Sequence, residues 1–188
     1  MKPIRLVTPL TGDLRAGLRV GDEVLLSGVL FTARDAAHRK FAELLQRGKR
    51  LPSFLNGSCI FYAGPTPAVP GMAVGSCGPT TSSRMDRFTP ALLAAGVVGF
   101  IGKGGRDEKV RRALMKYKGV YFLAIGGAGA LIATKIRTAR TVLYKDLGPE
   151  AVYRLEVEDL PLIVGIDMKG NDIYKTNYGV EDEKRSGT

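Results

Sequence analysis

A run of short polar side chains at 78–84 is the densest set of chemical groups in this sequence. It reads Gly-Pro-Thr-Thr-Ser-Ser-Arg, so four hydroxyl groups are followed by one guanidinium. One hydroxyl is enough to cap a helix, and four in a row exceed what capping needs. Glycine lets backbone approach a ligand closely, and the arginine fork matches the geometry of a carboxylate. The sequence therefore predicts an anion site here, with candidate residues Gly78, Thr80, Thr81 and Arg84.

Two further glycine-rich segments, at 102–105 and 126–129, each follow an apolar run and precede a predicted helix. Such loops gather where parallel strands end, and helix N-termini there can face an anion. Lys103 stands between glycines, where it can either neutralise an anion or extend along the surface into solvent. The segment 126–129 lacks the third small residue of a dinucleotide fingerprint, which disfavours a nucleotide.

Arg34 is predicted to lie in the first turn of a helix, beside free backbone N–H groups. A cation there opposes the helix dipole, so a nearby anion would stabilise it. That anion can be a ligand, or a carboxylate such as that of Asp35, and the sequence leaves both open. His38, the single histidine, lies in the same predicted helix.

The chain carries 28 lysine and arginine residues and a formal net charge of +10. Basic chains bind nucleic acid, acidic partner subunits or small anionic substrates. The cations are spread along the sequence and tryptophan is absent, so we do not expect a nucleic-acid interface. The densest basic segment, 106–118, is interpreted as the solvated face of one helix.

Only two cysteines are present, Cys59 and Cys77, with no further cysteine or histidine cluster. An iron–sulfur cluster usually takes three or four thiolates, so this chain alone cannot supply them. We interpret both cysteines as small buried residues without a chemical role, and we expect no metal ligands on this chain. No apolar run reaches the length of a membrane span and no secretory signal is visible, so a cytoplasmic location is expected.

The elements that must position these residues follow an α/β pattern, in which strand, glycine loop and helix repeat. Thr32 and Asp35 fit a capping box at the start of the helix that ends near Gly48. Residues 56–79 are rich in Gly and Pro, as functional loops often are. The expected strands are 4–8, 22–30, 59–62, 72–74, 97–101, 120–125, 141–144, 152–157 and 162–166. The expected helices are 32–48, 83–88, 90–95, 107–117 and 130–135. We expect one domain over 1–188, with a frayed tail at 181–188.

Three motifs make the chain similar to a known family. They are Ser-Gly-Val-Leu-Phe-Thr-Ala-Arg-Asp-Ala-Ala-His at 27–38, Gly-Pro-Thr-Thr-Ser-Ser-Arg-Met-Asp at 78–86, and Gly-Lys-Gly-Gly at 102–105. In order and spacing they resemble the C-terminal domain, or separate β subunit, of the iron–sulfur-dependent hydro-lyases. These are the class I fumarases and the L(+)-tartrate dehydratases. The resemblance covers essentially the whole chain.

The resemblance implies a swivelling β/β/α fold, a mixed sheet with helices packed on it, whose site opens onto a partner. That partner, an α subunit, would hold a 4Fe–4S cluster on three cysteines, with one iron open to the substrate as a Lewis acid. The shortage of cysteines here agrees with this division. The assembly implied is two α and two β subunits, and the isolated chain is expected to form a homodimer.

Carried over by position, Arg34, Arg84 and Lys103 match the family's binders of substrate carboxylates, and His38 lies within the matching first motif. Thr80 matches the residue proposed to abstract the proton from C3. A hydroxyl is a weak acid, so this role needs nearby cations to stabilise the alkoxide. The same cations would stabilise the aci-carboxylate that forms when the proton leaves.

The function implied is the reversible hydration of fumarate to L-malate. Dehydration of L(+)-tartrate stays open, because both substrates are C4 dicarboxylates with the same cationic anchors. A non-catalytic anion-binding or assembly module is the alternative from a different class.

Overall fold

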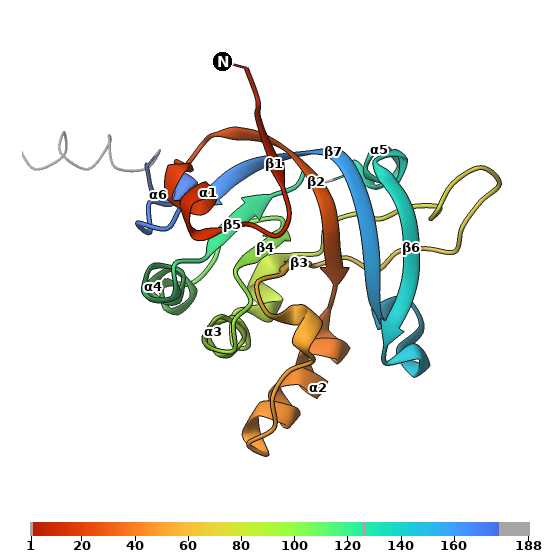
Figure 1. Cartoon of the computed structure of the whole chain (residues 1–188), viewed down its shortest axis with the longest axis horizontal. Coiled ribbons are helices and arrows are strands. Elements are labelled where there is room, and N and C mark those ends of the chain that lie inside the picture. The colour runs from red at the N-terminus through yellow and green to blue at the C-terminus, as the bar shows by residue number, and fades with distance from the viewer. Residues whose placement is uncertain (1, 126, 177–188) are drawn as a thin grey trace, which may run out of the picture.

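The computed structural model describes residues 2–125 and 127–176. The frayed tail expected at 181–188 lies outside these described residues, as does Gly126 of the third glycine loop. The described part forms one seven-stranded mixed sheet with helices packed on it (Figure 1). The mixed α/β class expected from the sequence is confirmed.

Five parallel strands in sequence order form the first layer of the sheet. They are β1 (Ile4–Val7), β2 (Glu23–Thr32), β3 (Cys59–Phe61), β4 (Gly99–Gly102) and β5 (Val120–Leu123). All of their carboxyl ends therefore lie at one edge. The parallel pairing predicted from the strand–loop–helix repeat is confirmed.

Two antiparallel strands form the second layer, β6 (Ile136–Leu143) and the long β7 (Val152–Ile166). β7 pairs with β5 through part of its length and with β2 through another part. The hydrogen-bonded ladders therefore close into a ring that runs β2–β3–β4–β5–β7 and back to β2. Strands β1 and β6 lie outside this ring as the two free edges of the described sheet.

Apolar side chains fill both sides of the parallel layer. Leu26, Phe61 and Leu160 belong to the cluster between the two strand layers. Phe100 and Phe41 belong to a second cluster, which lies under the helices. Figure 1 shows α2, α3 and α4 together on one side of the strands, with β6 and α5 elsewhere. The layers are thus strand, strand and helix, as the resemblance implied.

The helices and short turns complete the order of elements. They are α1 (Gly12–Gly17), α2 (Asp35–Gln46), η1 (Ser53–Leu55), η2 (Ser82–Met85), α3 (Thr89–Ala94), α4 (Glu108–Tyr117), α5 (Gly129–Thr134), η3 (Lys145–Glu150) and α6 (Ile173–Thr176). No helix in the described residues is long and apolar enough to cross a membrane.

Four expectations about the elements are wrong. The helix expected at 83–88 is a single 3₁₀ turn, η2. The strand expected at 72–74 does not form. The two strands expected at 152–157 and 162–166 are one continuous strand, β7. The capping box also fails, because Arg34 rather than Thr32 occupies the N-cap of α2.

Thr32 is the last residue of β2, and its hydroxyl serves the sheet instead of the helix. The Tyr153 N–H donates to Thr32 Oγ1 at 3.0 Å, which ties the end of β2 to the start of β7. Thr32 lies near the start of a helix but is hydrogen-bonded to a distant strand. The spacing of residues along the sequence does not reveal this partner.

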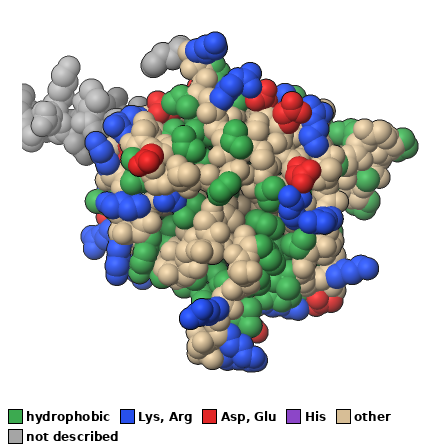
Figure 2. Space-filling model, in the orientation of Figure 1, with side chains coloured by type: hydrophobic (Ala, Val, Ile, Leu, Met, Phe, Trp, Pro, Cys, Tyr) green, Lys and Arg blue, Asp and Glu red, His purple; other side chains and the backbone are tan. Residues whose placement is uncertain are grey.

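Lys and Arg side chains on the face shown in Figure 2 form separate groups around the outline. They do not merge into one continuous stripe on that face. The distribution on this face agrees with the spread of cations along the sequence.

Candidate active site

The Thr80 segment lies along the carboxyl ends of β3 and β4. The Thr80 N–H donates to the carbonyl oxygen of Tyr62 at 2.6 Å, and Pro79 forms an antiparallel bridge with Ala63. Tyr62 follows β3 directly, so the strand end itself holds the backbone of the predicted anion loop. The Thr80 side chain is half-buried there.

The Lys103 loop runs beside the same segment. Thr81 and Lys103 form a parallel bridge. The Ser82 N–H donates to the Lys103 carbonyl at 2.9 Å, and the Lys103 N–H donates to the Thr80 carbonyl at 3.4 Å. Both the Thr81 and the Lys103 side chains are exposed. Two loops that the sequence separates by about twenty residues are thus joined backbone to backbone.

The described part of the third glycine loop meets the first one at Gly78. The Cys77 N–H donates to the Gly129 carbonyl at 3.1 Å. A Cβ atom added to Gly129 would lie 3.1 Å from the Gly78 nitrogen and 2.5 Å from Ser76 Oγ, so only glycine fits without displacement. The predicted gathering of the glycine loops at one edge is confirmed for the described residues.

Arg84 reaches from η2 to the start of α2. Its Nε donates to Asp35 Oδ1 at 3.0 Å, and its Nη2 lies 2.8 Å from Asp35 Oδ2. The ion pair, with one hydrogen bond from Nε, holds the Arg84 guanidinium beside Asp35. The Arg84 side chain remains 50% exposed, and its Nη1 edge is the part that Asp35 does not engage.

Arg34 lies at the N-cap of α2, one residue before the partner of Arg84. Its Nη2 is 3.7 Å from Glu150 Oε1, while Glu150 Oε2 accepts the Ala36 N–H at 2.8 Å. A Cβ atom on Gly64 would lie 3.2 Å from both Arg34 Cδ and Nη1, so this glycine gives the arginine room. Of the two anions that the sequence left open, a carboxylate is present, and it belongs to Glu150.

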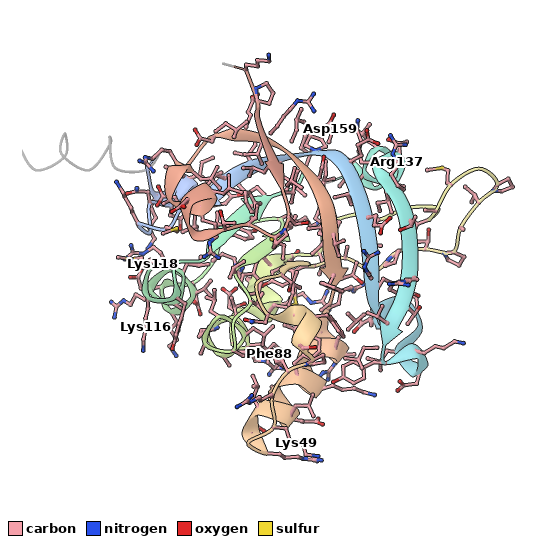
Figure 3. The ribbon with its side chains drawn as sticks, viewed as in Figure 1. Lys49, Phe88, Lys116, Lys118, Arg137 and Asp159 are labelled. Carbon is pink, nitrogen blue, oxygen red and sulfur yellow. The ribbon has the colours of Figure 1, made fainter. Side chains whose placement is uncertain are left out.

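His38 is fully buried in the core between α2 and the sheet. Its ring packs against Tyr62 and Phe88, the latter labelled between α2 and α3 in Figure 3. Burial lowers the pKa of His38 to about 4, so the imidazole is neutral at pH 7. The structure does not bring this side chain to the exposed surface of Thr81 and Lys103. Its role in substrate binding stays a prediction.

A buried ion pair behind these loops was missed by the sequence reasoning. Arg106 Nε donates to Asp86 Oδ1 at 2.6 Å, and the arginine side chain has no exposed surface. The expectation that 106–118 is a solvated face is therefore wrong at its first residue. Arg106 precedes α4 and points into the protein because Tyr62, Tyr121 and Asp86 surround it. Such a tertiary pairing leaves no local signal in the sequence.

Neither cysteine is placed to bind a metal. Both Cys59 and Cys77 are free and buried, and burial raises the pKa of each thiol to about 12. Within residues 2–125 and 127–176, no three His, Cys, Asp or Glu side chains are grouped so that they could hold a metal ion. The described residues therefore do not fit an iron–sulfur cluster, which needs several accessible thiolates.

Comparison with known proteins agrees with the motifs that meet at this site. The family model described as fumarase C-terminus matches residues 1–177. The chain is 41% identical over 157 residues to Fumarate hydratase 2 of Leishmania major, and the match covers 82% of this chain. It spans only 28% of the length of that relative.

Shorter relatives match over most of their own length. A putative L(+)-tartrate dehydratase subunit beta of Methanocaldococcus jannaschii is 40% identical, over 84% of each chain. The L(+)-tartrate dehydratase subunit beta of Escherichia coli is 36% identical, over 98% of this chain and 92% of that relative.

Proposed function

The chain belongs to the family of the fumarase C-terminus, and from this we propose that it forms the carboxylate-binding half of a hydro-lyase active site. The reaction proposed is the reversible hydration of fumarate to L-malate. The observation that carries the proposal is the backbone junction between Thr81 and Lys103. It brings a hydroxyl-rich segment and an exposed cation together at one edge of the sheet.

Three cations are proposed to bind the carboxylates of a C4 dicarboxylate. Lys103 is exposed beside Thr81, and Arg84 presents its Nη1 edge while it pairs with Asp35. Arg34 lies at the same end of α2 as Asp35. Two carboxylates of a substrate need at least two positive groups to offset their charge, and these residues provide them.

Thr80 is proposed as the base that takes a proton from the carbon beside a substrate carboxylate. For this its Oγ1 must first lose its own proton, which nearby positive charge favours. Because η2 is a single turn, its dipole contributes little, and Arg84 and Lys103 must supply most of this stabilisation. The same two cations would stabilise the extra negative charge that develops on the substrate carboxylate.

A partner chain is proposed to carry the 4Fe–4S cluster. Two observations support this division of the site. The described residues offer no group that could hold a metal, and relatives that match over most of their length are named as β subunits. The partner would be an α subunit, in an assembly of two α and two β chains, or a homodimer when this chain is isolated. A cytoplasmic location is proposed with it.

Dehydration of L(+)-tartrate is a second candidate, favoured by a specific observation. The tartrate dehydratase subunit beta of Escherichia coli aligns over 92% of its length, whereas the chain spans 28% of Fumarate hydratase 2 of Leishmania major. The ratio of kcat/KM values for malate, tartrate and mesaconate-type substrates would decide between the two.

The split-site proposal predicts that this chain alone has no hydratase activity. Activity should arise when it is combined anaerobically with the cluster-bearing chain of its own organism. The measurement is the ultraviolet absorbance of fumarate formed from malate, made for each chain and for the mixture, with tartrate assayed in parallel. Full activity of this chain alone would contradict the split site. A cluster-loaded complex that is inactive on every C4 substrate would support a non-catalytic module instead.

A further inference from the structure

A buried cluster of polar side chains lies directly behind the two loops of the candidate site. At its centre is Arg106, whose Nε contacts Asp86 at 2.6 Å and whose Nη2 donates to Thr89 Oγ1 at 2.7 Å and to the Tyr62 hydroxyl at 3.3 Å. Its guanidinium carbon lies 5.3 Å from the Tyr62 ring centroid and 4.9 Å from that of Tyr121. One planar cation thus contacts four side chains that come from three segments of the chain.

This cluster holds the Thr80–Arg84 segment at three points. The Tyr62 carbonyl accepts the Thr80 N–H. The Tyr121 hydroxyl is hydrogen-bonded to the buried Ser82 Oγ at 2.9 Å. Asp86 lies two residues after Arg84, so its ion pair with Arg106 fixes the end of the same turn.

The same cluster holds the Lys103 loop. The Tyr121 hydroxyl also contacts the Gly104 carbonyl at 2.8 Å, and Asp86 Oδ2 accepts the Asp107 N–H at 2.8 Å. Asp86 and Tyr121 therefore each bind both loops. Burial raises the pKa of the Tyr121 hydroxyl, so it stays protonated and remains a donor.

We propose that Arg106 is a positioning residue that sets the distance between Thr80 and Lys103 through Asp86, Tyr62 and Tyr121. The proposal rests on the proposed function, because it assigns a catalytic purpose to that distance. Removing Arg106 would leave Asp86 uncompensated in the core and would weaken the support behind the two loops, which would still be joined by the backbone hydrogen bonds of Lys103 with Thr80 and Ser82.

The chemistry of the cluster argues for a geometric role over a purely stabilising one. A buried ion pair is poor evidence for stability, because apolar residues of similar volume often stabilise a core as well. Only the planar guanidinium can contact Asp86, Thr89 and Tyr62 at once while stacking on two rings. A lysine at the same position offers a point charge and cannot reproduce this arrangement.

Arg106→Lys in the complete complex with the cluster-bearing partner tests the proposal. We expect kcat/KM to fall by roughly tenfold or more, since small errors in orientation are costly. We also expect the pH dependence of kcat to move upward by roughly 0.5 pH unit or more, because the cations would stabilise the Thr80 alkoxide less. A smaller fraction of folded enzyme would lower kcat by the same factor at every pH and would not shift the profile along the pH axis. The charged groups of the proposed site that enter this comparison are Lys103, Arg84 with its partner Asp35, and Arg34 with its neighbour Glu150.

Arg112→Gln is the matched control, because Arg112 forms a surface ion pair with Glu108 within α4, the helix that follows Arg106, and its side chain is 76% exposed. This variant should keep wild-type kcat/KM and pH profile within about twofold. If Arg106→Lys does not fold, as judged by circular dichroism, Asp86→Asn replaces it, since the amide retains an acceptor for Arg106. Faster hydrogen exchange of the Thr80 and Ser82 amides, with the β4 amides unchanged, is then the expected result.

The outcomes separate the two proposals. An active wild-type complex with an unchanged Arg106→Lys profile overturns the positioning role and leaves the proposed function standing. An inactive wild-type complex overturns the proposed function. Hydrogen exchange of the Thr80 and Ser82 amides then tests whether Arg106 holds the two loops in place. Faster exchange in Arg106→Lys, with β4 amides unchanged, supports control of the loops by Arg106, and equal exchange overturns it.

Discussion

The three cations of the candidate site differ in how freely they can offer their charge. Arg84 is held by Asp35, and Arg34 lies 3.7 Å from Glu150. Within residues 2–125 and 127–176, Lys103 forms no ion pair. Of the three, Lys103 can therefore give most of its charge to a bound anion.

Replacing Thr80 with Ala should lower kcat by roughly 10²-fold or more if its hydroxyl is the base. Thr80→Ser keeps a hydroxyl, so its kcat should decrease much less. The measurement is steady-state kcat for malate in the complete complex. Ser83→Ala, an exposed neighbour in the same run, serves as the control. A Thr80→Ala enzyme within about threefold of wild type would remove Thr80 from this role.

The burial of His38 predicts a pH-dependent stability. Burial lowers its pKa from 6.5 to about 4. Between these two values the unfolded chain binds a proton at His38 and the folded chain does not. The free energy of unfolding is therefore highest above about pH 6.5 and decreases as the pH falls toward 4. Between pH 7 and pH 5 the His38 contribution should lower the free energy of unfolding by about 2 kcal/mol. Urea unfolding of wild type and His38→Gln at both pH values measures it.

The difference between the two proteins isolates His38, because the chain has a single histidine and the carboxylates contribute alike to both. An identical pH dependence in His38→Gln would contradict the low pKa.

At this scale the loops that meet at the candidate site could be predicted from the sequence, and the buried ion pair behind them could not. The hydroxyl run and Lys103 are adjacent in sequence to the glycines that mark their loops, so local pattern was sufficient. The pair of Arg106 and Asp86 depends on two segments folding against each other. Nothing in the residues between them, 87–105, indicates that meeting.

At the scale of elements, one glycine determines how closely η2 approaches β4. A Cβ atom on Gly102 would overlap Ser82 Oγ and lie 2.8 Å from Tyr62 Cδ2. Gly102→Ala should therefore push η2 away and cost about 1–3 kcal/mol of stability, as overpacking does. Urea denaturation measures the change in the free energy of unfolding.

Gly105→Ala is the matched control, because the nearest atom to its Cβ position is Tyr174 Cδ2 at 3.6 Å, an ordinary contact. Equal losses for the two variants would mean that the approach of η2 is not limited by Gly102.

Elements with a regular apolar period were predictable, and those defined by long-range pairing were not. The helix expected at 107–117 is α4, and its N-cap residue Asp107 accepts the Val110 N–H at 2.8 Å. In contrast, β7 was expected as two strands because Glu158 and Asp159 interrupt its apolar pattern. Pairing with β2, β5 and β6 carries the strand through that interruption.

At the scale of the whole molecule, β7 joins both layers of strands into one ring. A strand shared by three neighbours couples their stability, so we expect the chain to unfold as one domain in a single cooperative transition. Urea curves followed by circular dichroism and by tyrosine fluorescence should coincide. Two separate transitions would contradict the single-domain prediction.

The closed ring leaves β1 and β6 as the free edges of the described sheet, and both carry residues that discourage pairing with another chain. Pro3 and Pro9 flank β1, and proline cannot donate to a neighbouring strand. β6 exposes Arg137, labelled in Figure 3, and Arg140. Two copies meeting edge to edge at β6 would bring like charges together. The described sheet thus resists templated aggregation at both of its free edges.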